Sequence, residues 1–170
     1  MKSSFLTALL VSVALQSTAS EVSLCGPSER IVFSCTLENE KIASVCLGNG
    51  ESALLLQYRF GAMGVTPELV FPASAADGQK LMSFTSYGAA KWESSELLFQ
   101  IGQHTYRVHS YSGVYDEPQA WITIREPSGS CIASFQCRPD YVNELITLNQ
   151  IGLPEASREP LKKKCRDAGG

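Results

Sequence analysis

The sequence has few of the residues on which catalysis and metal binding usually depend. Its 170 residues include only two histidines, His104 and His109, which are five positions apart on one predicted strand. They should therefore face opposite sides of a sheet and cannot share a metal ion. The sequence also has no Cys-x-x-Cys pair, His-Glu-x-x-His segment, calcium loop or phosphate-binding glycine loop. We therefore predict no metal site and no cofactor, and a protein that is not an enzyme.

A serine hydrolase is the catalytic alternative that stays open. His109 has Ser110 and Ser112 nearby, but a serine at position 110 leaves no Gly-x-Ser-x-Gly elbow. We expect both histidines to be exposed or half-buried strand residues. The acids of this region are scattered over predicted loops and strand ends, with no sign of paired catalytic carboxylates: Glu93, Glu96, Asp116 and Glu117.

Neither positive nor negative charge is in large excess. The chain has 14 Lys and Arg, 17 Asp and Glu, and a formal net charge of -3. No basic stripe is present, so nucleic acid is not a predicted partner. The single basic run, Lys162 to Lys164, is interpreted as part of a solvated tail.

Long apolar runs are absent except at the N-terminus. Lys2, the apolar stretch 5–15 and the small residues 17–20 predict a secretory signal peptide, cleaved after Ala19 or Ser20. The apolar stretch is too short to span a membrane, and no membrane insertion is predicted elsewhere. We expect residues 1–20 to be the signal peptide, 21–154 one β-rich domain and 155–170 a polar C-terminal tail.

Six cysteines follow the predicted cleavage site, and an even number in an exported chain indicates up to three disulfides. They are Cys25, Cys35, Cys46, Cys131, Cys137 and Cys165. Cys131 and Cys137 end one predicted strand, about 20 Å apart, so they must find partners elsewhere. Cys35 and Cys46 could bridge a hairpin. The pairing otherwise stays open.

The rest of the chain has a strand pattern. Apolar and β-branched stretches separated by turn residues lie at 30–36, 41–47, 53–60, 67–72, 81–86, 96–101, 104–111, 119–125 and 131–137. Gly102-Gln103 marks a two-residue hairpin. After Pro139, the spacing of Tyr141, Leu145 and Leu148 predicts one short helix, capped by Asp140. The predicted fold is all-β: a single antiparallel β-sandwich or barrel of about eight or nine strands, with a short C-terminal helix.

The segment 104–118 begins as an alternating strand and ends in Ser112-Gly113-Val114-Tyr115, closed by Pro118. A rigid strand that leads into a glycine-containing loop with hydroxyl side chains can present a small recognition surface. The local pattern is equally typical of a hairpin turn with ordinary strand tyrosines.

Ser112-Gly113-Val114-Tyr115 resembles the Ser-Gly-x-Tyr signature of the periplasmic lysozyme inhibitors of Gram-negative bacteria, and the chain is most similar to those directed at invertebrate-type lysozymes. The resemblance extends over most of residues 25–137, although segments 31–35 and 56–61 also look like a broader set of exported bacterial proteins. It implies a periplasmic inhibitor whose partner is lysozyme.

In that family the loop enters the lysozyme cleft. The resemblance implies that the hydroxyls of Ser112 and Tyr115 bond to the catalytic carboxylates and that Gly113 permits a tight turn. Tyr111 and Asp116 are further candidate contacts, with Tyr111 and Tyr106 as packing support and Asp116 and Glu117 at the cleft rim. The alternatives are a binding or immunity protein for another peptidoglycan hydrolase and an envelope domain without a specific ligand. Formation of a homodimer stays open.

Overall fold

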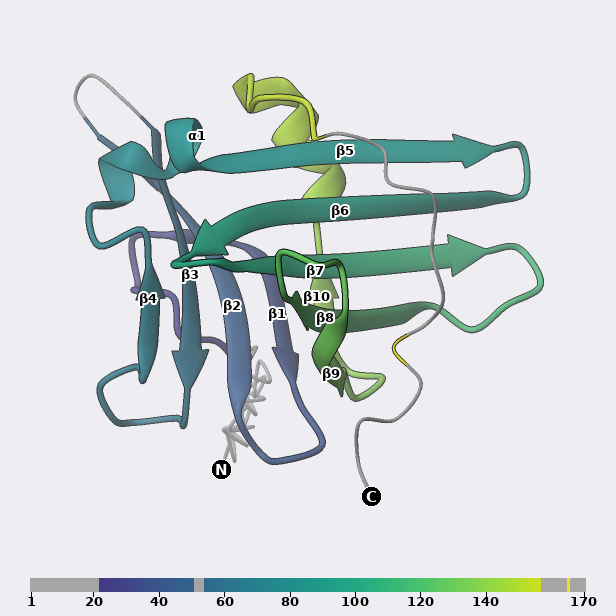
Figure 1. The fold of residues 1–170 in the computed structure, drawn as a ribbon. Helices are drawn as coiled ribbons and strands as arrows, with labels where there is room; N and C mark the ends of the chain where they lie inside the picture. Colours follow the sequence, from purple (N-terminus) through teal and green to yellow (C-terminus); the bar gives the residue numbers. More distant parts are fainter. Residues whose placement is uncertain (1–21, 51–53, 157–164, 166–170) are drawn as a thin grey trace, which may run out of the picture.

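In the computed structural model of the protein, the residues described are 22–50, 54–156 and 165 (Figure 1). The signal peptide predicted for residues 1–20 and the basic run at 162–164 lie outside them. Within the described residues, no helix is long and apolar enough to cross a membrane.

Two antiparallel five-stranded sheets form a sandwich, which confirms the predicted fold class. The first sheet has the order β10-β1-β2-β3-β4 and the second β5-β6-β7-β8-β9. Their strands run crosswise to each other in Figure 1, as in orthogonally packed sheets. The strands are β1 (Arg30–Thr36), β2 (Ile42–Asn49), β3 (Leu54–Gly61), β4 (Leu69–Phe71), β5 (Met82–Ala89), β6 (Trp92–Ile101), β7 (His104–Gly113), β8 (Gln119–Arg125), β9 (Cys131–Gln136) and β10 (Val142–Asn143).

The core lies between the sheets and is built from the inward-facing residues of each strand. Leu56 and Tyr58 of β3 meet Phe99 of β6 and Val108 of β7, all fully or almost fully buried. The rings of Tyr58 and Phe99 lie 4.9 Å apart. Alternate residues of each strand point into this layer, so the period-two pattern of the sequence follows from burial of one face.

The C-terminal helix differs from the prediction. Val142 and Asn143 pair with β1 as strand β10, so the helix cannot begin at Asp140. It is a 3-10 helix, η2 (Leu145–Ile151), that follows Glu144 and ends at Gly152, whose φ is 69°. Burial of Leu145 and Leu148, three residues apart, suits the period of a 3-10 helix. Two short helices, η1 (Ala75–Asp77) and α1 (Gly78–Leu81), have no periodic signal in the sequence.

The cysteines form three disulfides: Cys25–Cys46, Cys35–Cys137 and Cys131–Cys165. Cys131 and Cys137 do pair elsewhere, as predicted. The suggested Cys35–Cys46 bridge is wrong because the register of β1 and β2 places Cys35 opposite Ala43. Three disulfides indicate an oxidising, extracellular-type compartment.

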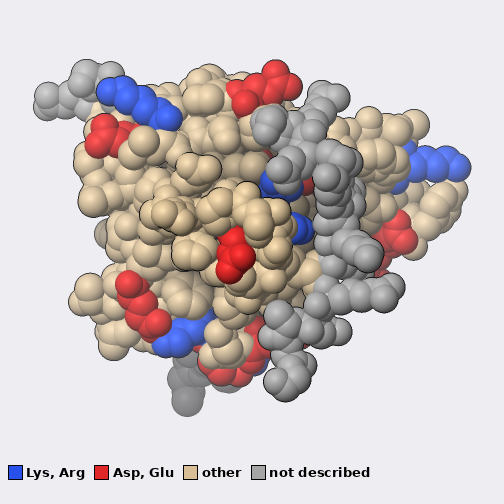
Figure 2. Space-filling view, viewed as in Figure 1, with Lys and Arg blue, Asp and Glu red and all other residues tan. Residues whose placement is uncertain are grey.

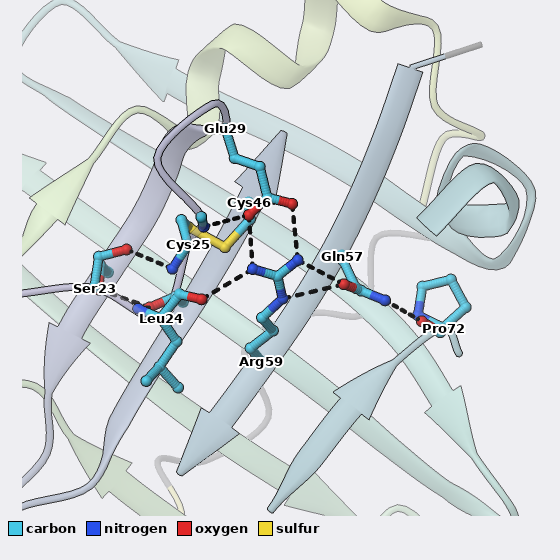
Figure 3. Close-up of polar contacts among 11 residues, drawn as sticks. Ser23, Leu24, Cys25, Glu29, Cys46, Gln57, Arg59 and Pro72 are labelled. Atoms are coloured by element: carbon cyan, nitrogen blue, oxygen red, sulfur yellow. Dashed lines mark hydrogen bonds and ion pairs between the residues drawn. A yellow bond between two sulfur atoms is a disulfide. The ribbon is translucent and has the colours of Figure 1, made fainter. Parts of the chain in front are cut away.

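A polar cluster fastens residues 22–29 to the outer face of the first sheet (Figure 3). Arg59 of β3 donates to both carboxylate oxygens of Glu29, at 2.6 and 2.7 Å, and to the carbonyl oxygen of Leu24 at 2.9 Å. Arg59 is therefore half of an ion pair. Burial raises the pKa of Glu29, but the bonds from Arg59 and the Gly26 amide outweigh it, so this pKa lies below its usual range.

Candidate functional site

The candidate loop lies at one end of the second sheet, beside the turn between β5 and β6 (right in Figure 1). Ser112 and Gly113, expected in the loop, are the last residues of β7 and stand opposite Glu93 and Trp92 of β6. The N–H of Val114 donates to the carbonyl oxygen of Lys91 at 2.9 Å, which joins the loop to the β5–β6 turn. The loop itself is therefore limited to residues 114–118.

The loop tip exposes two large apolar side chains. Tyr115 is 81% exposed and Val114 is 68% exposed. The Nζ of Lys91 lies 5.3 Å from the centre of the Tyr115 ring, within the range of a cation–π contact. A shallow depression lined by residues 89–93 and 112–114 lies next to the tip. The tip is thus a projecting aromatic residue on an ordered strand end.

The hydroxyl of Ser112 already has a carboxylate partner. Its Oγ donates to Oε1 of Glu93 at 3.2 Å, across the β6–β7 pair. This is an exposed contact, so water competes for it and it contributes little to stability. A carboxylate on a docked partner could take the place of Glu93.

Asp116 folds back over the end of β7. The Tyr111 hydroxyl donates to Oδ2 of Asp116 at 2.7 Å. This hydrogen bond, with smaller effects of desolvation and of the Asp116 charge, raises the pKa of Tyr111. The ring of Tyr111 stacks on Trp92 at 6.5 Å, and Tyr87 meets Trp92 edge-on at 5.8 Å.

Gly113 begins the turn of the loop. It is the last residue of β7, its carbonyl oxygen accepts the N–H of Asp116 at 3.4 Å at the start of the turn, and it is not among the described glycines with positive φ. A Cβ at this position would lie 2.8 Å from Oδ2 of Asp116 and 3.0 Å from the Tyr111 hydroxyl oxygen. A Cβ at position 113 therefore requires the ends of these two exposed side chains to shift. Tyr106, expected to support the loop, packs instead against Phe99 in the core, at 5.4 Å.

A buried polar cluster on the outer face of the second sheet was missed by the sequence reasoning. Glu96 and His109 are each 4% exposed. The expectation that His109 is exposed or half-buried is therefore wrong. Glu96, expected in a loop or at a strand end, is a buried residue within β6. Oε1 of Glu96 lies 3.4 Å from Nδ1 of His109, and Oε2 lies 3.3 Å from Nη1 of Arg107. The His109 ring stacks on Trp121 at 4.8 Å.

The charges in this cluster are set by opposing effects. Burial lowers the pKa of His109, and the Glu96 carboxylate offsets this only in part. Burial raises the pKa of Glu96, but interactions with His109, the Arg107 charge and the Tyr87 hydroxyl outweigh it, and the pKa is lowered. At neutral pH, Glu96 is ionised and His109 is neutral.

The serine–histidine alternative is not supported by this arrangement. The hydroxyl within reach of Nε2 of His109 is that of Thr123, at 3.5 Å. Ser110 lies next to His109 on β7 and so points to the other face of the sheet. Among the described residues, one group of metal-binding side chains lies close together (Cys25, Glu29 and Cys46), but both sulfurs are used in a disulfide.

Charged side chains gather into no single-sign stripe on the face shown in Figure 2, where red and blue groups are scattered among uncharged ones. Comparison of the chain with protein-family models, curated proteins and solved structures gave no match. Function is therefore inferred from the geometry of the loop and from the signature that it carries.

Proposed function

We propose that the protein is a periplasmic inhibitor of lysozyme, which inserts the Ser112–Tyr115 segment into the active-site cleft of the glycosidase. The observation that carries the proposal is the exposure of Tyr115, at 81%, on a loop held against two paired strands. An exposed tyrosine beside an exposed valine, on a loop bonded to the sheet, suits a recognition surface. The three disulfides support an exported protein.

The chemistry of the cleft suits the two hydroxyls. A retaining glycosidase has two carboxyl groups about 5 Å apart. In the proposed complex, Tyr115 donates its O–H to one catalytic carboxyl group of the glycosidase. Ser112 gives up its bond to Glu93 and donates to the second catalytic carboxyl group. Each bond to a carboxylate in a desolvated cleft stabilises the complex by about 1.5–3 kcal/mol, more than an exposed bond to Glu93 can. The loop also blocks entry of the sugar chain.

Inhibition assays with chicken-, goose- and invertebrate-type lysozymes test the proposal. The variants are Ser112→Ala and Tyr115→Phe, which each remove one hydroxyl, and their combination. We expect strongest inhibition of the invertebrate type and a loss of about 10- to 150-fold in affinity for each hydroxyl removed. Ser128→Ala is the matched control, because Ser128 also donates to a glutamate, Glu126, in an exposed turn.

Full inhibition by the double variant would show that the loop mechanism is wrong. If the wild-type protein inhibits none of the three lysozymes but is retained by an immobilised peptidoglycan amidase or peptidase, its target is another cell-wall hydrolase.

A further inference from the structure

We propose that Asp116 is a positioning residue, which together with Tyr111 clamps the loop over Gly113 and holds Tyr115 outward before any partner arrives. The proposal rests on the proposed function for its effect on inhibition. The clamp itself is a property of the protein alone and can be tested without a partner.

The loop is tied to the sheet on both sides of Tyr115. On one side, the N–H of Val114 donates to the Lys91 carbonyl oxygen at 2.9 Å. On the other, Oδ2 of Asp116 accepts from the Tyr111 hydroxyl at 2.7 Å. Tyr115 is the residue between these two attachment points. These attachments restrict the backbone at position 115, and Lys91, whose Nζ lies 5.3 Å from the centre of the Tyr115 ring, contacts the side chain itself.

The clamp is built on a supported base. Tyr111 belongs to β7, stands opposite Ser94 of β6, and stacks its ring on Trp92. Trp92 is in turn packed by Tyr87 from β5. The Tyr111 ring, which carries the exposed hydroxyl, is therefore packed in a row with side chains from two neighbouring strands. A loop anchored in this way loses less conformational entropy on binding than a loop without anchors.

Gly113 provides the space that the clamp needs. The Asp116 carboxylate and the Tyr111 hydroxyl occupy the volume where any other residue would place its Cβ. The glycine of the four-residue signature thus belongs to the same unit as Asp116, which lies outside that signature.

Inhibition constants of single and double variants test whether Asp116 and Tyr111 act together. Asp116→Ala removes the acceptor, and Tyr111→Phe removes the donor but keeps the ring on Trp92. We expect each substitution to weaken inhibition about tenfold. The double variant should inhibit as strongly as either single variant. Asp116→Asn, which keeps an acceptor oxygen, should retain most of the inhibition. Asp140→Asn removes an exposed carboxylate outside the loop and should change inhibition less than twofold.

Measurements on the protein without a partner separate this proposal from the proposed function. In Asp116→Ala and in Tyr111→Phe, the NMR order parameters of the amides of residues 114–117 should fall. In Asp116→Ala, the pKa of Tyr111 should move down toward its usual value, because the hydrogen bond that raises it is lost. Unchanged order parameters would overturn the clamp, whatever the inhibition data show.

The remaining outcomes are also decisive. If the order parameters fall while inhibition stays within twofold, Asp116 holds the loop but does not position it for binding, and the proposal is overturned. If Asp116→Asn weakens inhibition as much as Asp116→Ala, loss of the charge rather than loss of positioning explains the effect. If the wild-type protein inhibits no hydrolase yet the order parameters fall as expected, the clamp stands and the proposed function fails.

Discussion

Gly113→Ala adds one methyl group at the point where the loop is most tightly packed. The new Cβ would lie 2.8 Å from Oδ2 of Asp116, about 0.6 Å short of an ordinary contact. It would also lie 3.0 Å from the Tyr111 hydroxyl oxygen. Both partners of this 2.7 Å hydrogen bond must therefore shift, and we expect the bond to weaken.

The consequences of this substitution should be local. Asp116 and Tyr115 are exposed, so the free energy of unfolding should change by only about 0.5 kcal/mol, or roughly 2 °C in Tm. Inhibition should weaken about tenfold or more, because the loop loses the bond between Asp116 and Tyr111. Thermal unfolding and an inhibition assay measure the two effects separately.

The matched control is Gly48→Ala in β2. Gly48 is also a strand glycine outside the positive-φ region, and an added Cβ would lie 3.4 Å from Cβ of Leu55, an ordinary contact. This variant should inhibit as the wild-type protein does. If Gly113→Ala also inhibits normally and leaves the pKa of Tyr111 raised, the close packing of Gly113 does not control the loop. A large loss of stability in Gly113→Ala would instead make the loop part of the folded core.

Two further predictions concern stability. Replacing Cys35 and Cys137 together by alanine removes a crosslink between residues 102 positions apart. Chain entropy predicts that the free energy of unfolding, measured in urea, falls by up to about 4.7 kcal/mol. A fall of less than about 1 kcal/mol would contradict this prediction. Burial lowers the pKa of His109 in the folded protein, so the His109 side chain binds a proton more readily in the unfolded chain. The free energy of unfolding should therefore fall as the pH decreases through about 6.5. In His109→Gln, the free energy of unfolding should depend less on pH between about 7.5 and 5, and an identical dependence would rule out His109 as the cause.

The strands could be predicted because burial of one face leaves a period-two pattern in each segment. The Gly102-Gln103 turn also predicts the register of the two strands that it joins. A two-residue hairpin at this position fixes the register of β6 and β7, which places Glu96 opposite His109. The pairing of Glu96 with His109 could therefore have been expected from the sequence. Its burial could not, because that depends on what covers the outer face of the sheet.

Other features had no usable local signal. Cys35 reaches Cys137 because the end of β9 lies beside β1, where Leu37 forms a bridge with Cys137. That contact joins residues about a hundred positions apart, and no spacing of cysteines encodes it. The helix predicted after Pro139 begins later than expected because of a similar long-range contact. Val142 pairs with Ser34 of β1, and this pairing satisfies backbone groups that a helix would otherwise have used.

The sequence by itself determined the all-β class, most strand positions and the location of the loop, because these follow from the alternation of side chains and from turn residues. It also supplied the Ser-Gly-Val-Tyr signature. Only the tertiary structure decided the disulfide pairing, the Glu29–Arg59 attachment and the role of Gly113. These depend on which atoms meet across strands and loops, and the side chain of Asp116 occupies the space above Gly113 only when the loop has folded back onto Tyr111.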